Sequence, residues 1–343
     1  MTALDVLPPW HRSCRADVPI APDTIAGILD GDGSLGLVGR RGRQVPAVSL
    51  SMRDDDPTPI AVARSLAAFV GRPLGGVYHH GGRHHWRVGS LADVSAVIAF
   101  LERHRPLSPR GALQLRAIAE AAAILRSIRA RRGARAPLTV DEADRLAGLR
   151  ASIPGRGPVS EPLPLPATTE TADLRTLHDY FAGFAAAERC FETRTSGSHH
   201  ARPVFRLTQR VDNLGLLEHL RDRLGIGRIA PVSVTVGSPA YQLIVEREDD
   251  VDTLVALLRV HPLPEASPKS TQLDASAELI AIRRGVISNG ARGDLGRSAA
   301  VAALVAELRD AKRYAGPQSL CTCPTPEVAR ASASRHGPDP TLR

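Results

Sequence analysis

The stretch Ile25-Ala-Gly-Ile-Leu-Asp-Gly-Asp-Gly-Ser-Leu35 decides the fold, because a related stretch follows 156 residues later as Phe181-Ala-Gly-Phe-Ala-Ala-Ala-Glu-Arg-Cys-Phe191. Both stretches begin with an apolar residue followed by Ala-Gly. Both then place an acidic residue at the eighth position, Asp32 in the first and Glu188 in the second. A pattern that returns at a fixed offset indicates an internal repeat.

The similarity continues downstream of these two stretches. Pro46–Arg53 aligns with Pro203–Arg210 at an offset of 157, and the dipeptide Pro106-Leu107 aligns with Pro262-Leu263 at 156. Several weak matches in the same order at nearly the same offset indicate a tandem duplication of about half the chain.

Each copy predicts the same series of elements: a helix, two strands, a helix, two strands and a helix. The predicted ranges are 21–32, 34–40, 45–53, 58–70, 74–79, 84–89 and 91–103 in the first copy, and 172–188, 190–195, 202–210, 212–224, 228–236, 239–246 and 249–259 in the second. The fold class is therefore α+β, with two αββαββα domains and antiparallel sheets. We expect a first domain over 1–150, a proline-rich linker over 151–170, a second domain over 171–315 and a disordered tail over 316–343.

The composition favours a nucleic-acid partner without proving one. The formal net charge is +8, and all but two of the 44 basic residues are arginine, the lysines being Lys269 and Lys312. Arginine suits phosphate groups and base edges, but a GC-rich genome would also favour arginine over lysine. The sequence shows neither an apolar run long enough to span a membrane nor a secretion signal, so we expect a cytoplasmic protein, associated with the nucleoid, without a membrane partner.

Small residues spaced four apart on the two repeated helices predict that these helices pack closely side by side. These helix-interface residues are Gly27, Gly31, Gly183 and Ala187. Such packing brings Asp32 and Glu188 together near a pseudo-twofold axis. Two nearby carboxylates repel each other unless divalent cations neutralise them, and oxygen ligands of this kind select Mg²⁺ or a similar hard ion. The alternative, a polar residue before a glycine helix cap, does not explain why the second copy keeps an acid at this position.

Ile25–Gly33 resembles the signature of the LAGLIDADG homing endonucleases, and Phe181–Arg189 resembles a degenerate second copy. The resemblance covers roughly residues 20–285. It implies a saddle of two curved sheets on double-stranded DNA, with a single chain acting as a monomer of pseudo-twofold symmetry. Asp32 and Glu188 occupy the position of the family's metal-binding acids.

Three further positions match those of the family's catalytic residues. Gln209 stands where the family often has a polar residue that organises water, although Met52 replaces it in the first copy. Arg110 and Lys269 match a basic residue that would stabilise charge on the phosphate. Solvated surface cations are the alternative interpretation of these two residues.

Two departures put the second half-site in doubt. Ala186 replaces the acid found two places before the catalytic one, and Arg189 replaces the glycine that follows it. Either change could weaken metal binding, which would leave a nickase or a protein that binds DNA without cutting it.

Strand residues are the candidates for reading DNA. The DNA-binding candidates are Arg40, Arg53, Arg202, Arg206 and Arg210. We expect one sheet face to carry Arg40, Arg206, Gln209 and either Arg202 or Gln242. Alternating polar residues on any half-exposed strand are the alternative interpretation. His79-His80-Gly-Gly-Arg-His84-His85 predicts a hairpin tip that contacts DNA, with a zinc site as the less favoured reading.

The leading functional hypothesis is a site-specific, Mg²⁺-dependent double-strand DNA endonuclease that uses metal-activated water. The alternative is a non-cleaving DNA-binding protein or transcription regulator on a degenerate LAGLIDADG scaffold. An RNA-splicing maturase would share the fold and leave no distinguishing residue. No motif in the sequence identifies the target DNA sequence or the host element.

Overall fold

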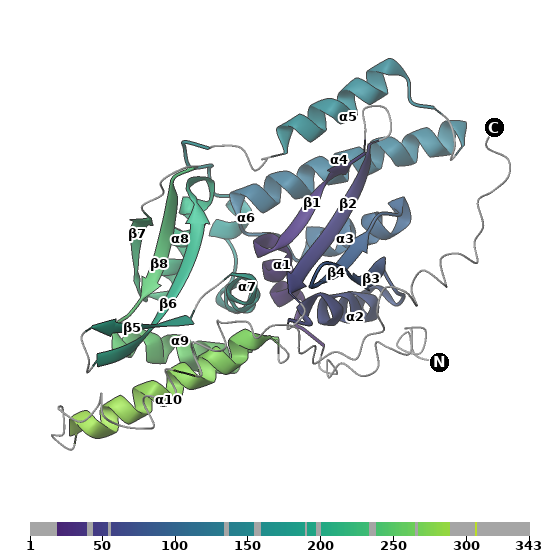
Figure 1. Ribbon diagram of the computed structural model, residues 1–343. Helices are drawn as coiled ribbons and strands as arrows, with labels where there is room; N and C mark the ends of the chain where they lie inside the picture. Colours follow the sequence, from purple (N-terminus) through teal and green to yellow (C-terminus); the bar gives the residue numbers. More distant parts are fainter. Residues whose placement is uncertain are drawn as a thin grey trace.

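The structure is a computed structural model (Figure 1). It describes residues 19–39, 44–53, 56–133, 137–153, 159–188, 191–196, 200–232, 238–264, 267–288 and 306. Arg40, Arg189 and the predicted tail over 316–343 lie outside the described residues.

The first repeat contains the predicted series of elements, followed by two more helices. Its elements are α1 (Pro22–Gly31), β1 (Gly33–Val38), β2 (Val45–Arg53), α2 (Thr58–Val70), β3 (Gly76–His79), β4 (Arg83–Val88), α3 (Leu91–Arg103), α4 (Pro109–Arg132) and α5 (Val140–Ser152).

The second repeat has the same order. Its elements are α7 (Leu174–Ala187), β5 (Phe191–Ser196), β6 (His200–Arg210), a single 3-10 turn (Val211–Asn213), α8 (Leu214–Leu224), β7 (Arg228–Val232), β8 (Ala240–Val245), α9 (Glu248–Val260) and α10 (Pro268–Ser288). A short helix, α6 (Ala167–Glu170), lies inside the predicted linker, where Thr169 Oγ1 donates to the Leu107 carbonyl at 2.8 Å. This end of the segment is therefore docked on the first repeat rather than extended.

Both repeats form a four-stranded antiparallel sheet of the same topology, which confirms the predicted fold class. The strand orders are β1-β2-β4-β3 and β5-β6-β8-β7. The β3–β4 turn places Gly81 and Gly82 at φ of 58° and 70°, the left-handed conformation that a type I′ turn requires at both of its central residues. The predicted hairpin is therefore present.

Each sheet buries one face under helices and leaves the other open. In the first sheet, the alternating side chains of Val48, Leu50, Trp86 and Val88 are fully or almost fully buried. The indole N–H of Trp86 donates to the Leu74 carbonyl at 2.9 Å, so the one polar group of this large side chain is satisfied. Period-two alternation thus fixes which face packs and which remains available to a partner.

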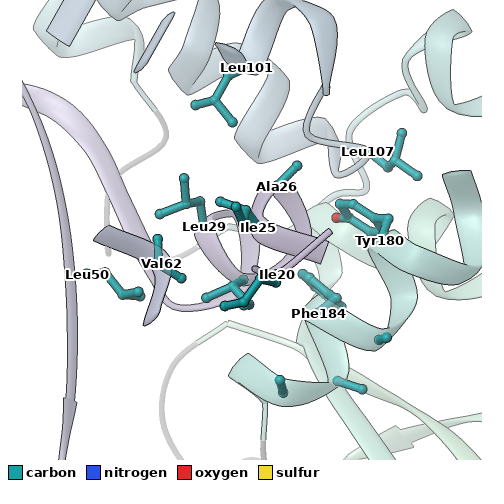
Figure 2. Packing of buried hydrophobic residues seen from close by; sticks show 14 of the residues in the cluster. Ile20, Ile25, Ala26, Leu29, Leu50, Val62, Leu101, Leu107, Tyr180 and Phe184 are labelled. Atoms are coloured by element: carbon teal, nitrogen blue, oxygen red, sulfur yellow. The ribbon is translucent and has the colours of Figure 1, made fainter. Parts of the chain in front are cut away.

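The two repeated helices, α1 and α7, pack side by side between the sheets (Figure 1). A Cβ on Gly27 would lie 2.8 Å from the Phe184 nitrogen and closer still to the Tyr180 carbonyl oxygen. A Cβ on Gly183 would lie 3.0 Å from the Ile28 nitrogen and closer to the Thr24 carbonyl oxygen. The backbones touch because both positions lack a side chain. Figure 2 shows Tyr180 and Phe184 of α7 beside Ala26 of α1.

A carboxylate in the last turn of α1 links three elements. Asp30 Oδ2 accepts hydrogen bonds from the Ser108 backbone N–H at 2.9 Å and from the Tyr180 hydroxyl at 2.6 Å. Burial raises the pKa of Asp30, while these bonds and the charge of Arg110 oppose the rise. Asp30 therefore joins α1 to α7 and to the start of α4. No helix among the described residues is long and apolar enough to cross a membrane.

Candidate active site at the ends of α1 and α7

The two acidic residues are the C-terminal cap residues of the paired helices. The Asp32 backbone N–H donates to the Ile28 carbonyl at 3.1 Å, and the Glu188 backbone N–H donates to the Phe184 carbonyl at 3.0 Å. The packing of α1 against α7 at Gly27 and Gly183 brings the helix ends together. Their carboxylates are electrostatically coupled, since the charge of Asp32 contributes to the pKa of Glu188.

The two carboxylates have different surroundings. Asp32 is exposed, whereas Glu188 is mostly buried. Burial raises the pKa of Glu188 to about 7, the Asp32 charge adds to the rise, and Gln209 and Lys269 oppose it. Burial and the nearby Asp32 charge therefore both disfavour the ionised form of Glu188 when no cation is bound.

Lys269 lies at the start of α10, where its ammonium group contacts the backbone. Its Nζ donates to the Ala186 carbonyl at 2.5 Å and also to the Glu188 carbonyl. Ala186 aligns with Asp30 of the first repeat at the offset of 156. The ammonium of Lys269 thus holds the end of α7 in place and reduces the pKa of Glu188 from a distance.

Gln209 on β6 contacts the acid directly. Its Nε2 donates to Glu188 Oε1 at 2.8 Å, and its Oε1 accepts from Asn213 Nδ2 at 2.8 Å. Asn213 Oδ1 in turn accepts from the backbone N–H of Arg110 at 3.4 Å. The chain of bonds runs from the second half-site to α4 of the first repeat.

The equivalent of Gln209 in the first repeat is Met52, which is buried in the core with 5% of its surface exposed. A thioether neither donates to a carboxylate nor orders water strongly. Met52 therefore cannot donate to Asp32 the hydrogen bond that Gln209 donates to Glu188.

The open face of the first sheet carries basic and aromatic side chains. Arg53 lies opposite Arg83 across β2 and β4, and Arg83 Nε donates to Ser51 Oγ at 2.9 Å. Tyr78 and His85 stack with ring centroids 5.0 Å apart. His84 points to the other face and is buried, so the histidines of the hairpin do not share one surface.

The open face of the second sheet carries arginines paired with carboxylates. Arg206 forms an ion pair with Glu192, and Arg228 Nη2 lies 2.9 Å from Glu246 Oε1. Glu246 also lies 3.4 Å from Arg194. These ion pairs lie on the open face of the second sheet.

The remaining strand predictions are placed as follows. Arg202 is exposed and lies opposite Arg194, while Arg210 forms an ion pair with the buried Asp212. Gln242 Nε2 donates to Thr208 Oγ1 at 2.8 Å, which places Gln242 on the open face with Arg206. The expected placement of Gln209 on that face is wrong. It lies an odd number of residues from Arg206, so strand alternation turns it toward the helix ends.

The donor set suits a hard divalent ion. No group of three or more histidine, cysteine, aspartate or glutamate side chains able to hold a metal ion is present among the described residues. Mg²⁺ commonly binds through one or two carboxylates together with water and substrate phosphates. Asp32 and Glu188 supply carboxylate oxygens of the kind used in that mode of binding.

Sequence reasoning did not find three residues that shape the site: Tyr180, Asn213 and Glu246. The acid at position 30 was visible in the repeated stretch, but its bond to Tyr180 on α7 is not, because it joins positions 150 residues apart. Asn213 stands just before α8, where its type predicts a helix cap rather than a site residue.

Fold and site together define a duplicated α+β protein with two acidic helix ends between two open sheets, which is the LAGLIDADG homing endonuclease fold. No family model matches the chain, and no curated protein matches it. Among solved structures, it is similar to the meganuclease I-SmaMI bound to uncleaveable DNA, with a TM-score of 0.67 and 17% identity over 87% of this chain and 97% of that one.

Two further solved structures are similar over nearly their full length. The meganuclease I-AabMI bound to uncleaved DNA matches with a TM-score of 0.61 and 19% identity, over 86% of this chain and 99% of that one. The homing endonuclease I-GzeII in complex with its DNA target matches with a TM-score of 0.62 and 15% identity, over 85% and 97%.

Proposed function

We propose that this protein is a site-specific, Mg²⁺-dependent endonuclease that cuts both strands of double-stranded DNA and acts as a monomer. The observation that carries the proposal is the close packing of α1 and α7, which couples Asp32 and Glu188 at one place. Because one chain supplies both acids, a second copy is not needed to complete the site.

The two open sheet faces support DNA as the substrate. They carry arginines on both sides of the helix ends, and the net charge of +8 favours association with a polyanion, which also underlies the expected nucleoid association. The solved structures that the chain resembles include complexes with DNA, one of them I-SmaMI bound to an uncleaved target in the presence of calcium ions.

The chain's own groups have separate tasks in this reaction. When bound, a divalent ion polarises the scissile phosphate and activates water. Asp32 and Glu188 would hold it by their oxygens, while Gln209 orients Glu188. Arg110 and Lys269 are proposed to place positive charge near the phosphates, Lys269 from its position on the backbone carbonyls at the end of α7.

One observation favours the second candidate, a DNA-binding protein that does not cut. The half-site at Glu188 is altered by Ala186, and Lys269 is occupied by backbone carbonyls. A protein that keeps its sheet faces but has lost metal binding at one or both acids would bind its target and leave it intact.

The decisive experiment is a selection of cleaved sites from a random DNA library in Mg²⁺, followed by assays on the recovered site. Asp32→Asn and Glu188→Gln should each reduce the cleavage rate by about a hundredfold or more. The matched control is Asp222→Asn, which removes an exposed carboxylate on α8 that pairs with Arg221. Specific binding without metal-dependent cutting would establish the second candidate, and no affinity for DNA would remove both.

A further inference from the structure

Asn213 has the position of a helix cap without the function of one. It immediately precedes α8, yet its side chain makes no capping bond to that helix. Its aligned counterpart in the first repeat, Asp56, lies one residue before the cap residue of α2, Pro57, and accepts a bond from the Thr58 backbone N–H at 3.0 Å. Here the 3-10 turn Val211–Asn213 leads directly into α8, and the Asn213 side chain bonds to groups outside that helix.

The side chain of Asn213 is buried, with 4% of its surface exposed, and it bridges the two repeats. Its Oδ1 accepts from the backbone N–H of Arg110, and its Nδ2 donates to Gln209 Oε1. Both ends of this amide are therefore engaged by groups that come from different halves of the molecule.

The backbone N–H of Arg110 fixes the direction of each hydrogen bond in the series that leads to Glu188. A backbone N–H only donates, so the Asn213 amide must turn its oxygen to Arg110 and its NH₂ group to Gln209. Gln209 must then turn its oxygen to Asn213, which leaves its NH₂ group for Glu188. An amide that rotated by half a turn would present an oxygen to the carboxylate and repel it.

We propose that Asn213 is a positioning residue for the half-site at Glu188, and that it transmits the orientation of the α4 backbone N–H of the first repeat to Gln209. The inference rests on the proposed nuclease function, which it refines. Met52 stands in place of Gln209 in the first repeat, and a thioether cannot donate the bond that Gln209 gives Glu188. The proposal therefore concerns one DNA strand.

The first test measures the cutting of each strand separately, in single-turnover reactions at saturating DNA, on a duplex labelled at both 5′ ends. Asn213→Asp keeps the size of the side chain and its acceptor for Arg110 but has no NH₂ group for Gln209. We expect the strand slowed by Glu188→Gln to be cut about 10- to 100-fold more slowly, with the other strand within about twofold of wild type. The matched control, Asp56→Asn, should leave both strands within about twofold.

The second test needs no activity. In ¹⁵N-labelled full-length protein, the side-chain NH₂ resonances of Gln209, identified by their loss in Gln209→Glu, should exchange slowly with solvent. Asn213→Asp should shift these resonances and change their exchange rate. The new carboxylate can only accept, so the Gln209 amide should rotate and turn its NH₂ group away from Glu188. Arg110→Ala keeps the backbone N–H and should leave them in place.

The two tests separate the proposal from the function on which it rests. Unchanged Gln209 resonances in Asn213→Asp, or equal slowing of both strands, would overturn the positioning role. If the wild-type protein cuts no DNA, the nuclease function fails, and the resonances alone decide whether Asn213 orients Gln209. Thermal unfolding of each variant identifies any loss of cutting that comes from misfolding.

Discussion

Replacing Glu188 by glutamine should stabilise the metal-free protein at alkaline pH. The pKa of Glu188 rises from 4.5 to about 7 on folding, chiefly because the side chain is buried and also because Asp32 is nearby. Since one pKa unit corresponds to about 1.4 kcal/mol, burying the charged form costs about 3 kcal/mol. Glutamine has no charge and keeps an oxygen that can accept from Gln209, so Glu188→Gln should recover most of this cost.

The sign of the pH dependence follows from proton binding. In the unfolded chain this carboxyl loses its proton near pH 4.5, whereas the native protein holds it until about pH 7. The native state therefore binds more protons between these values, and the wild-type protein loses stability as pH rises through this window. Glu188→Gln should gain little at pH 4.5 and about 3 kcal/mol at pH 8 relative to wild type.

Urea unfolding followed by circular dichroism, in EDTA and at intervals from pH 4.5 to pH 8, measures this difference. Glu218→Gln, which changes an exposed glutamate on α8, is the control and should show no such trend. Asp32→Asn should recover part of the gain, because it removes the second cause of the raised pKa. A gain for Glu188→Gln that is the same at both ends of the pH range would refute the reasoning.

Three further predictions concern the scaffold and the sheet face. Gly183→Ala should lower the free energy of unfolding by about 3 kcal/mol in urea titrations, because its Cβ would overlap the backbone of α1, while Gly148→Ala, which meets nothing within 4 Å, should raise it by about 0.5–1 kcal/mol. Asp30→Ala should cost about 3 kcal/mol in the same assay, since the Ser108 N–H and the Tyr180 hydroxyl lose their acceptor; a cost below about 1 kcal/mol would show that water replaces it. Glu246→Gln should change stability by less than about 1 kcal/mol and tighten binding of nonspecific DNA roughly threefold at low salt, measured by fluorescence anisotropy, with unchanged affinity counting against an open DNA-facing sheet.

The fold could be predicted from the sequence because its signals are local and occur twice. Apolar periodicity indicated the helices and strands, and the offset of 156 to 157 residues indicated the duplication. The small residues at Gly27 and Gly183 predicted a close helix pair, because positions without a side chain allow two helix backbones to approach each other. The acidic positions Asp32 and Glu188 followed from the same alignment.

The face on which a residue lies could be predicted only where the strand register was counted correctly. Alternation placed Arg206 and Gln242 on the open face, but the same rule excludes Gln209 from it. The predicted extended linker likewise missed α6, because the bond from Thr169 to the Leu107 carbonyl depends on a contact between distant parts of the chain.

By itself, the sequence determined that this chain is a duplicated α+β protein with an acid at the end of each repeated helix. Repeats, apolar periodicity and helix-packing glycines are local patterns that can be recognised without the structure. The tertiary structure alone decided that the two acids differ: Glu188 is mostly buried and accepts a bond from Gln209, while Asp32 is exposed. Burial and hydrogen bonding depend on which distant residues meet. The chain of bonds through Asn213 joins positions 103 residues apart, and no local pattern encodes that meeting.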